Sequence, residues 1–310
     1  MSKAVDASRL RGSIVPLVTP FTPEDEIDEQ AVRSLIDWQL DCGSHGISVT
    51  GTTGEPSALT LGERETMIRL AVDATAGRAP VLAGCGTNNL KETLHLTRVA
   101  ERAGADAALV IVPYYNRPTQ KGLEAYLCRV ADSTSLPVVV YNIPGRTAVN
   151  LLPETLARIR EASPNVVGVK EAYTDLQQVS EILQVVGRDF LVFSGIEALC
   201  FPMLALGGAG HVSATANVLP HEVAHLYDLA QAGRWDEARD LHYRLLPLNL
   251  ALFLETNPGP VKCVLGWMGK IHSALRLPLV PPQPAVEQRL AAALKDWAIQ
   301  TPALSGGPGA

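Results

Sequence analysis

A lysine at the end of an apolar run is the residue of this chain best suited to chemistry. Lys170 follows Val166-Val167-Gly168-Val169, which has the composition of a buried strand. An ammonium group buried without a partner costs far more free energy than a hydrogen bond returns, so a lysine there tends to become a neutral, nucleophilic amine. Such an amine can form a Schiff base with a carbonyl substrate. The alternative is a lysine that reaches into solvent or pairs with Glu171.

Three further groups could serve a lysine amine that attacks a 2-oxo acid. Tyr141 could relay protons through its phenol. Because a phenol is a weak acid, proton transfer would be assisted by a hydrogen-bonded chain of hydroxyls from Thr52 and Tyr115. The run Gly51-Thr52-Thr53-Gly54-Glu55 offers hydroxyls and backbone N–H groups to a small carboxylate, although it could also be an ordinary turn. Arg146 has the planar fork that binds a carboxylate, unless it is simply a surface arginine.

These residues follow short apolar runs that alternate with longer helical patterns along the chain. That alternation is typical of repeated βα units around a parallel sheet. We expect eight strands, beginning near Ser13, His45, Pro80, Ala107, Pro137, Val166, Phe190 and Gly208. Eight such units predict a (β/α)₈ barrel, and the alternative, a doubly wound sheet, would need a glycine-rich first turn that the sequence lacks.

The expected domain organisation is a barrel over residues 1–218, a C-terminal helical extension over 219–300 and a flexible tail over 301–310. Helical patterns continue from Pro220 to Ile299, with predicted interruptions at Pro247, at 257–260 and at 278–284. This is more helix than a barrel needs for closure. In a barrel of this type the chemistry lies at the carboxyl ends of the strands, where Lys170 and the Thr, Tyr and Arg motifs all fall.

Composition favours a globular protein of the cytosol whose partner is a small molecule. The 310 residues are 47% hydrophobic and 19% charged, with a net charge of −6 and no Lys/Arg-rich run, which argues against nucleic acid or an anionic membrane as partner. The first 12 residues lack the apolar core of a signal peptide, and no stretch is apolar enough to span a membrane. The five widely spaced cysteines predict reduced thiols rather than disulfides or a metal site.

We expect no metal site at the one pattern that imitates a zinc motif. His221-Glu222-Val223-Ala224-His225 matches H-E-x-x-H, but the helical spacing puts both histidines on the face opposite the apolar stripe. No third ligand stands at a standard offset. Lys262 is the other lysine in an apolar setting, and its place in the predicted extension indicates packing rather than chemistry.

Four motifs together resemble the dihydrodipicolinate synthase and N-acetylneuraminate lyase family. They occur in the family's order and spacing, and the resemblance extends from about Gly12 to about Leu277. The motifs are Gly51-Thr52-Thr53-Gly54-Glu55, Tyr114-Tyr115-Asn116, Tyr141-Asn142-Ile143-Pro144-Gly145-Arg146-Thr147 and Gly168-Val169-Lys170-Glu171-Ala172. The family resemblance implies a barrel with a helical extension, no cofactor beyond the covalent imine, and a homotetramer built as a dimer of dimers.

The resemblance also implies a role for each matching residue. Lys170 would be the Schiff-base lysine for pyruvate and Tyr141 the proton shuttle, linked through Thr52 to Tyr115, which would reach into the neighbouring subunit's site. The pyruvate would be held by the residues at three further positions, Thr53, Val212 and Gly195. The carboxylate of the aldehyde partner would bind Arg146, which favours the synthase branch and aspartate semialdehyde.

Two departures from the family pattern leave the second substrate open. Ile196 stands where the synthases usually have an acid, and Tyr173 where they have a small residue. One alternative is therefore an aldolase or dehydratase of the same family acting on another 2-oxo acid, such as a 2-keto-3-deoxy sugar acid. A non-catalytic barrel that senses an oxo acid is the other, although a sensor would not need the nucleophile Lys170.

Overall fold

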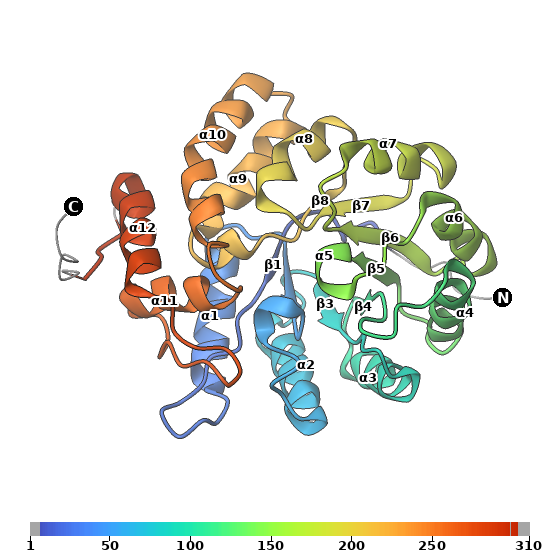
Figure 1. The fold of residues 1–310 in the computed structure, drawn as a ribbon, viewed down its shortest axis with the longest axis horizontal. Coiled ribbons are helices and arrows are strands. Elements are labelled where there is room, and N and C mark those ends of the chain that lie inside the picture. Colours follow the sequence, from blue (N-terminus) through green and yellow to red (C-terminus); the bar gives the residue numbers. More distant parts are fainter. Residues whose placement is uncertain (1–6, 298, 303–310) are drawn as a thin grey trace.

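Eight parallel strands close into a barrel in their sequence order, as the alternating pattern predicted (Figure 1). The computed structural model describes residues 7–297 and 299–302. Each strand begins within two residues of the expected position. The strands are β1 (Gly12–Pro16), β2 (Gly46–Val49), β3 (Val81–Gly84), β4 (Ala107–Ile111), β5 (Val138–Asn142), β6 (Val166–Glu171), β7 (Leu191–Ser194) and β8 (Gly210–His211).

Helices between the strands form the outer layer of the barrel. They are α1 (Glu29–Asp41), α2 (Leu61–Thr75), α3 (Leu90–Ala103), α4 (Gln120–Ala131), α6 (Pro153–Ala162), α7 (Leu176–Val185) and α8 (Cys200–Ala205), and α9 (Pro220–Gln231) packs against β1 after the last strand. Local signals explain several of their ends. Thr60 and Glu63 form a capping box before α2, and Gly104 ends α3 in the left-handed region.

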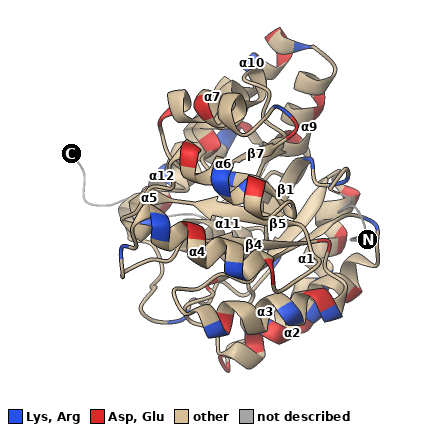
Figure 2. Cartoon of the chain, turned by 90° about the vertical axis from the view of Figure 1, so that its right-hand side faces the viewer, with Lys and Arg blue, Asp and Glu red and all other residues tan. Residues whose placement is uncertain are grey.

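Side-chain alternation along the strands gives the barrel two separate apolar cores. One lies between the sheet and the helices. The other fills the barrel interior and includes Leu82, Leu109, Val139 and Phe193. Charged residues of both signs are interspersed on the outer helices (Figure 2). No helix among the described residues is long and apolar enough to cross a membrane.

The C-terminal part contains α10 (Trp235–Ala251), α11 (Gly259–Trp267), α12 (Pro284–Leu294) and the short η4 (Lys295–Trp297), with α10 and α12 packed together at one side of the barrel (Figure 1). The predicted interruption at Pro247 is wrong, because α10 continues through it. Pro247 lies on the exposed face, where water can bond the carbonyl that its ring leaves free, and buried Leu245 and Leu248 hold the helix. The predicted tail lies outside the described residues after Pro302.

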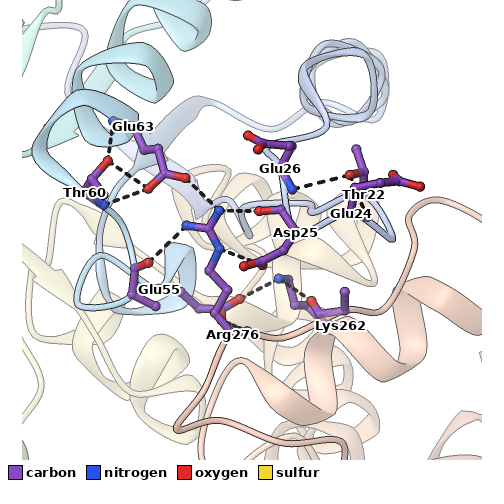
Figure 3. Close-up of polar contacts among 11 residues, drawn as sticks. Thr22, Glu24, Asp25, Glu26, Glu55, Thr60, Glu63, Lys262 and Arg276 are labelled. Carbon is purple, nitrogen blue, oxygen red and sulfur yellow. Dashed lines mark hydrogen bonds and ion pairs between the residues drawn. The ribbon is translucent and has the colours of Figure 1, made fainter.

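A buried ion pair joins this C-terminal part to the loop after β2 (Figure 3). Lys262 Nζ lies 2.5 Å from Glu55 Oε1, and both side chains are almost completely shielded from solvent. Burial lowers the pKa of Lys262 to about 8, although Glu55 favours its charged form. Nearby, the guanidinium of Arg276 pairs with Glu63 and Asp25 at 2.7 and 2.9 Å. Lys262 is therefore a structural group that anchors the extension.

We predict that Lys262→Met lowers the free energy of unfolding by about 3–5 kcal/mol, because it leaves the Glu55 carboxylate buried without its cation. Arg33→Met provides the control. It breaks the exposed pair of Arg33 with Asp73 and should cost at most about 1 kcal/mol. Urea denaturation measures both values. Equal losses in the two variants would contradict a special role for the buried pair.

Candidate active site

Lys170 lies against Tyr141 at the carboxyl ends of β6 and β5. The two residues are register partners in the parallel pair, and both point into the barrel. Lys170 is 5% exposed, and its Nζ lies 4.2 Å from the centroid of the Tyr141 ring. No carboxylate of the described residues forms an ion pair with it. Lys170 is therefore a buried lysine at the carboxyl ends of the strands, as predicted, and it has no ion-pair partner among the described residues.

The neighbouring carboxyl group, Glu171, faces away from the barrel interior because side chains alternate along a strand. Its carboxylate accepts hydrogen bonds from the side-chain amides of Asn142, at 2.9 and 3.1 Å, and Gln178, at 3.1 Å. Burial raises the pKa of Glu171 to about 7 against the effect of these donors. The alternative in which Lys170 pairs with Glu171 is therefore wrong.

Gly195 makes room for the lysine side chain. A methyl group in place of its hydrogen would lie 3.0 Å from Lys170 Cε and 2.8 Å from the Cβ of Ala172. Its backbone N–H donates to the carbonyl of Glu171 at 2.7 Å, which ties the end of β7 to the end of β6. Only glycine leaves this wall flat enough for the lysine to extend along it.

A small cavity of about 50 Å³ surrounds the end of Lys170. Its walls bring together residues from several strand ends and from the C-terminal part. They include the predicted residues Thr52, Thr53, Tyr141, Arg146, Gly195 and Val212, and also Glu197, Phe253 and Asn257. Seven of the eight predicted site residues thus meet at one place, with Lys170 among them, and a second cavity of about 300 Å³ shares Thr52, Tyr141, Arg146 and Asn257.

Comparison with known proteins identifies the family of this chain. A model of the dihydrodipicolinate synthetase family matches residues 9–297. This chain belongs to that family. A 4-hydroxy-tetrahydrodipicolinate synthase of Thermus thermophilus is 50% identical over 281 residues, which cover 90% of this chain and 94% of the relative. That of Nitratidesulfovibrio vulgaris Miyazaki F is 48% identical over 282 residues, 91% and 96% of the two chains.

Solved structures of dihydrodipicolinate synthases have the same fold. The enzyme from Aquifex aeolicus superposes with a TM-score of 0.91 at 42% identity, covering 93% of this chain and 98% of its own. The chloride-inhibited enzyme from Acinetobacter baumannii, solved in complex with pyruvate, has a TM-score of 0.91 at 36% identity, with 94% and 99% covered. The predicted barrel, the predicted family and its lyase activity are confirmed.

Tyr115 is the one predicted site residue of this family member that lies elsewhere. Its side chain is 88% exposed, its backbone has a φ of 70°, and it lines neither cavity. Within the described part of the chain, Thr52 and Tyr141 share the small cavity without a direct hydrogen bond. The hydroxyl chain from Tyr141 through Thr52 to Tyr115 is therefore not assembled inside a single copy.

Asn257, from the C-terminal part, is a site residue that sequence reasoning missed. Its side-chain amide donates to Thr53 Oγ1 at 2.9 Å, and its backbone carbonyl accepts a long hydrogen bond from Arg146 at 3.5 Å. From the sequence, residues 257–260 were predicted only to interrupt a helix. Asparagine before proline suggests a turn, and nothing local indicates that the turn meets a threonine about 200 positions away.

Glu197 is the second site residue that the sequence did not predict. It belongs to the short η2 (Glu197–Leu199) after β7 and is buried in the cavity wall. Neither of the residues that depart from the family pattern, Ile196 and Tyr173, lines either cavity in the described structure. The departures therefore lie outside the immediate surroundings of Lys170.

We predict that Gly195→Ala lowers the rate at which pyruvate and borohydride modify Lys170, because the added methyl group displaces the lysine side chain. Gly62→Ala is the matched control. Its new methyl group meets nothing within 4 Å, so reactivity should be unchanged. The rate of mass gain measures both, and thermal unfolding verifies that each variant folds. Wild-type reactivity in Gly195→Ala would show that the space is not needed.

Proposed function

We propose that this protein condenses pyruvate with aspartate semialdehyde as a 4-hydroxy-tetrahydrodipicolinate synthase, through an imine on Lys170. The observation that carries the proposal is the buried Lys170 amine beside Tyr141, in a cavity sized for a small molecule and without an ion-paired carboxylate. The names of the relatives at 46–50% identity support the same reaction. The imine itself serves as the electron sink, so the chemistry needs no further cofactor.

Each residue of the small cavity has a place in this scheme. The amine of Lys170 attacks C2 of pyruvate, and Tyr141 moves protons between nitrogen and oxygen. The hydroxyl of Thr53 and the backbone near Val212 hold the pyruvate, while Gly195 leaves it space. Orientation of this kind converts a bimolecular reaction into one between groups already in contact.

The aldehyde would enter through the larger cavity, where Arg146 binds its carboxylate. Arg146 lines both cavities, so it could contact a molecule bound in either one. The aldolase or dehydratase for a 2-keto-3-deoxy sugar acid remains the second candidate. A substrate rich in hydroxyls needs several polar partners. The apolar side chain of Ile196 offers no such partner, although its position departs from the synthase pattern as well.

Borohydride reduction in the presence of pyruvate tests the imine. We predict a stable mass gain on Lys170 and none on Lys262, the other buried lysine, because Lys262 is held by Glu55. Lys170→Ala should abolish both the adduct and turnover of pyruvate with aspartate semialdehyde. An adduct on another residue, or turnover by Lys170→Ala at the wild-type rate, would refute the assignment. Adduct formation without turnover of this aldehyde would favour the second candidate.

We further propose that Tyr115 acts in the site of a neighbouring copy, within a homotetramer. Tyr115 is 88% exposed in the single chain, so its ring is available to a partner, and the larger cavity of the same chain is lined by Thr52 and Tyr141. A second copy related by two-fold symmetry could insert its tyrosine there and complete the hydroxyl chain. Such an arrangement would account for the position of Tyr115 outside the two cavities that surround Lys170 and Tyr141 in the described residues.

Mixing two inactive variants tests this arrangement. Tyr115→Phe retains the lysine, and Lys170→Ala retains the tyrosine. If Tyr115 acts between copies, a mixed pair contains one complete site, and random pairing restores about a quarter of the wild-type activity. If the tyrosine acted in its own chain, no complete site would form and the mixture would remain inactive. Refolding the variants together from denaturant, with each refolded alone as control, gives the measurement.

A further inference from the structure

A buried carboxyl group in the wall of the small cavity has no role in the chemistry described so far. Glu197 is 5% exposed and lines the cavity together with Lys170 and Tyr141. It stands two residues after Gly195, the glycine that touches the lysine side chain. A bound 2-oxo acid in a cavity of about 50 Å³ would contact several of these walls at once.

The surroundings of Glu197 hold the carboxyl group in place but leave it able to exchange a proton. Its Oε1 accepts a hydrogen bond from the backbone N–H of Ala214 at 2.7 Å. The titratable groups that face it come from several elements: Lys170 on β6, Tyr141 on β5, Arg146 on α5 (Pro144–Thr147) and Cys200 on α8. In the described structure none of these groups forms an ion pair with it.

Burial raises the pKa of Glu197 to about 7, and the N–H of Ala214 and the charge of Lys170 limit the rise. A carboxyl group in this range is close to half protonated at neutral pH. General acids work best when their pKa lies near the working pH, which makes this group a far better proton donor than an ordinary phenol.

Imine formation requires such a donor. After the amine adds to the carbonyl, the carbinolamine must lose its hydroxyl group as water, and hydroxide is too poor a leaving group to depart unaided. We propose that Glu197 is a second catalytic acid of this site, which protonates the departing hydroxyl of the carbinolamine on Lys170. The inference rests on the proposed imine chemistry and adds a residue to it.

The step balances within the cavity. The carboxyl O–H bond of Glu197 breaks and its proton goes to the carbinolamine oxygen. The C2–O bond then breaks with its electron pair, and water leaves. The lone pair of Lys170 nitrogen forms the C=N bond. The products are a cationic iminium and the Glu197 carboxylate, an ion pair in the same small space, so the net charge of the cavity does not change.

Glu171 provides a matched comparison because it is similarly buried and adjacent to Lys170 in the chain. Its carboxylate lies on the other side of the strand, bonded to Asn142 and Gln178, and lines neither cavity. Its pKa is also raised to about 7 by burial. A titration or charge effect common to buried carboxyls would therefore appear in both residues, whereas a role in proton transfer would appear in Glu197 alone.

The test is rapid-quench trapping of the pyruvate adduct with borohydride at pH 6 to 9, in the wild-type protein, Glu197→Gln and Glu171→Gln. The glutamine at 197 keeps an oxygen for the Ala214 N–H, which preserves the contact between the loops. We expect adduct formation to slow about 100-fold in Glu197→Gln. The wild-type rate should fall as the pH rises through about 7, where the acid is lost, and this limb should disappear in Glu197→Gln but persist in Glu171→Gln.

Glu197→Asp retains an acid and should keep the descending limb of the pH profile at a reduced rate. This variant replaces Glu197→Gln in the test if the glutamine variant does not fold. Wild-type rates in Glu197→Gln, or the loss of the limb in Glu171→Gln as well, would overturn the proposal. If Glu197 had only a structural role, Glu197→Gln would lower the thermal stability and leave the pH profile unchanged. That result would also contradict the proposal. If the wild-type protein forms no pyruvate adduct at any pH, the proposed function itself fails.

Discussion

The structure depends on the burial of a lysine amine at the carboxyl end of a parallel strand. A charged ammonium in such a place would need a carboxylate beside it, and the strand alternation directs the nearest one, Glu171, to the outside of the barrel. Lys170 is left with an aromatic face, a glycine wall and a cavity. The cavity leaves the end of this side chain open to a small molecule, which the proposed imine chemistry requires.

The chain contains a second deeply buried lysine, and the comparison shows what decides between structure and chemistry. Lys262 has a carboxylate at 2.5 Å and a backbone carbonyl at 2.7 Å, so its ammonium is satisfied and serves as an anchor. Lys170 has neither. The same residue type, buried to a similar extent, thus has an ion-pair partner in one place and an open cavity in the other, and the partner sets the free-energy cost of burying the charge.

The C-terminal part is an integral component of the site. Through Lys262 it holds Glu55, which ends the loop carrying Thr52 and Thr53, and through Asn257 it touches Thr53 directly. The extension therefore fixes the loop that would bind the carboxylate of a 2-oxo acid. A barrel without it would keep Lys170 but would leave the threonine loop without its support.

The sequence by itself determined the eight strands, the family and most of the site, because strand periodicity and strand ends are local properties. Lys170, Tyr141, Thr52 and Arg146 could be assigned to one rim since all parallel strands of a barrel end on the same face. The continuous α10 was missed at Pro247, where buried neighbours outweigh a local helix breaker. Only the tertiary structure decided the remaining parts of the site. Asn257 contacts Thr53, and Glu197 lines the same cavity as Lys170, although the members of each pair lie far apart in the chain. Glu171 turns outward because of the side of the strand on which it lies. No local sequence pattern encodes these spatial relations.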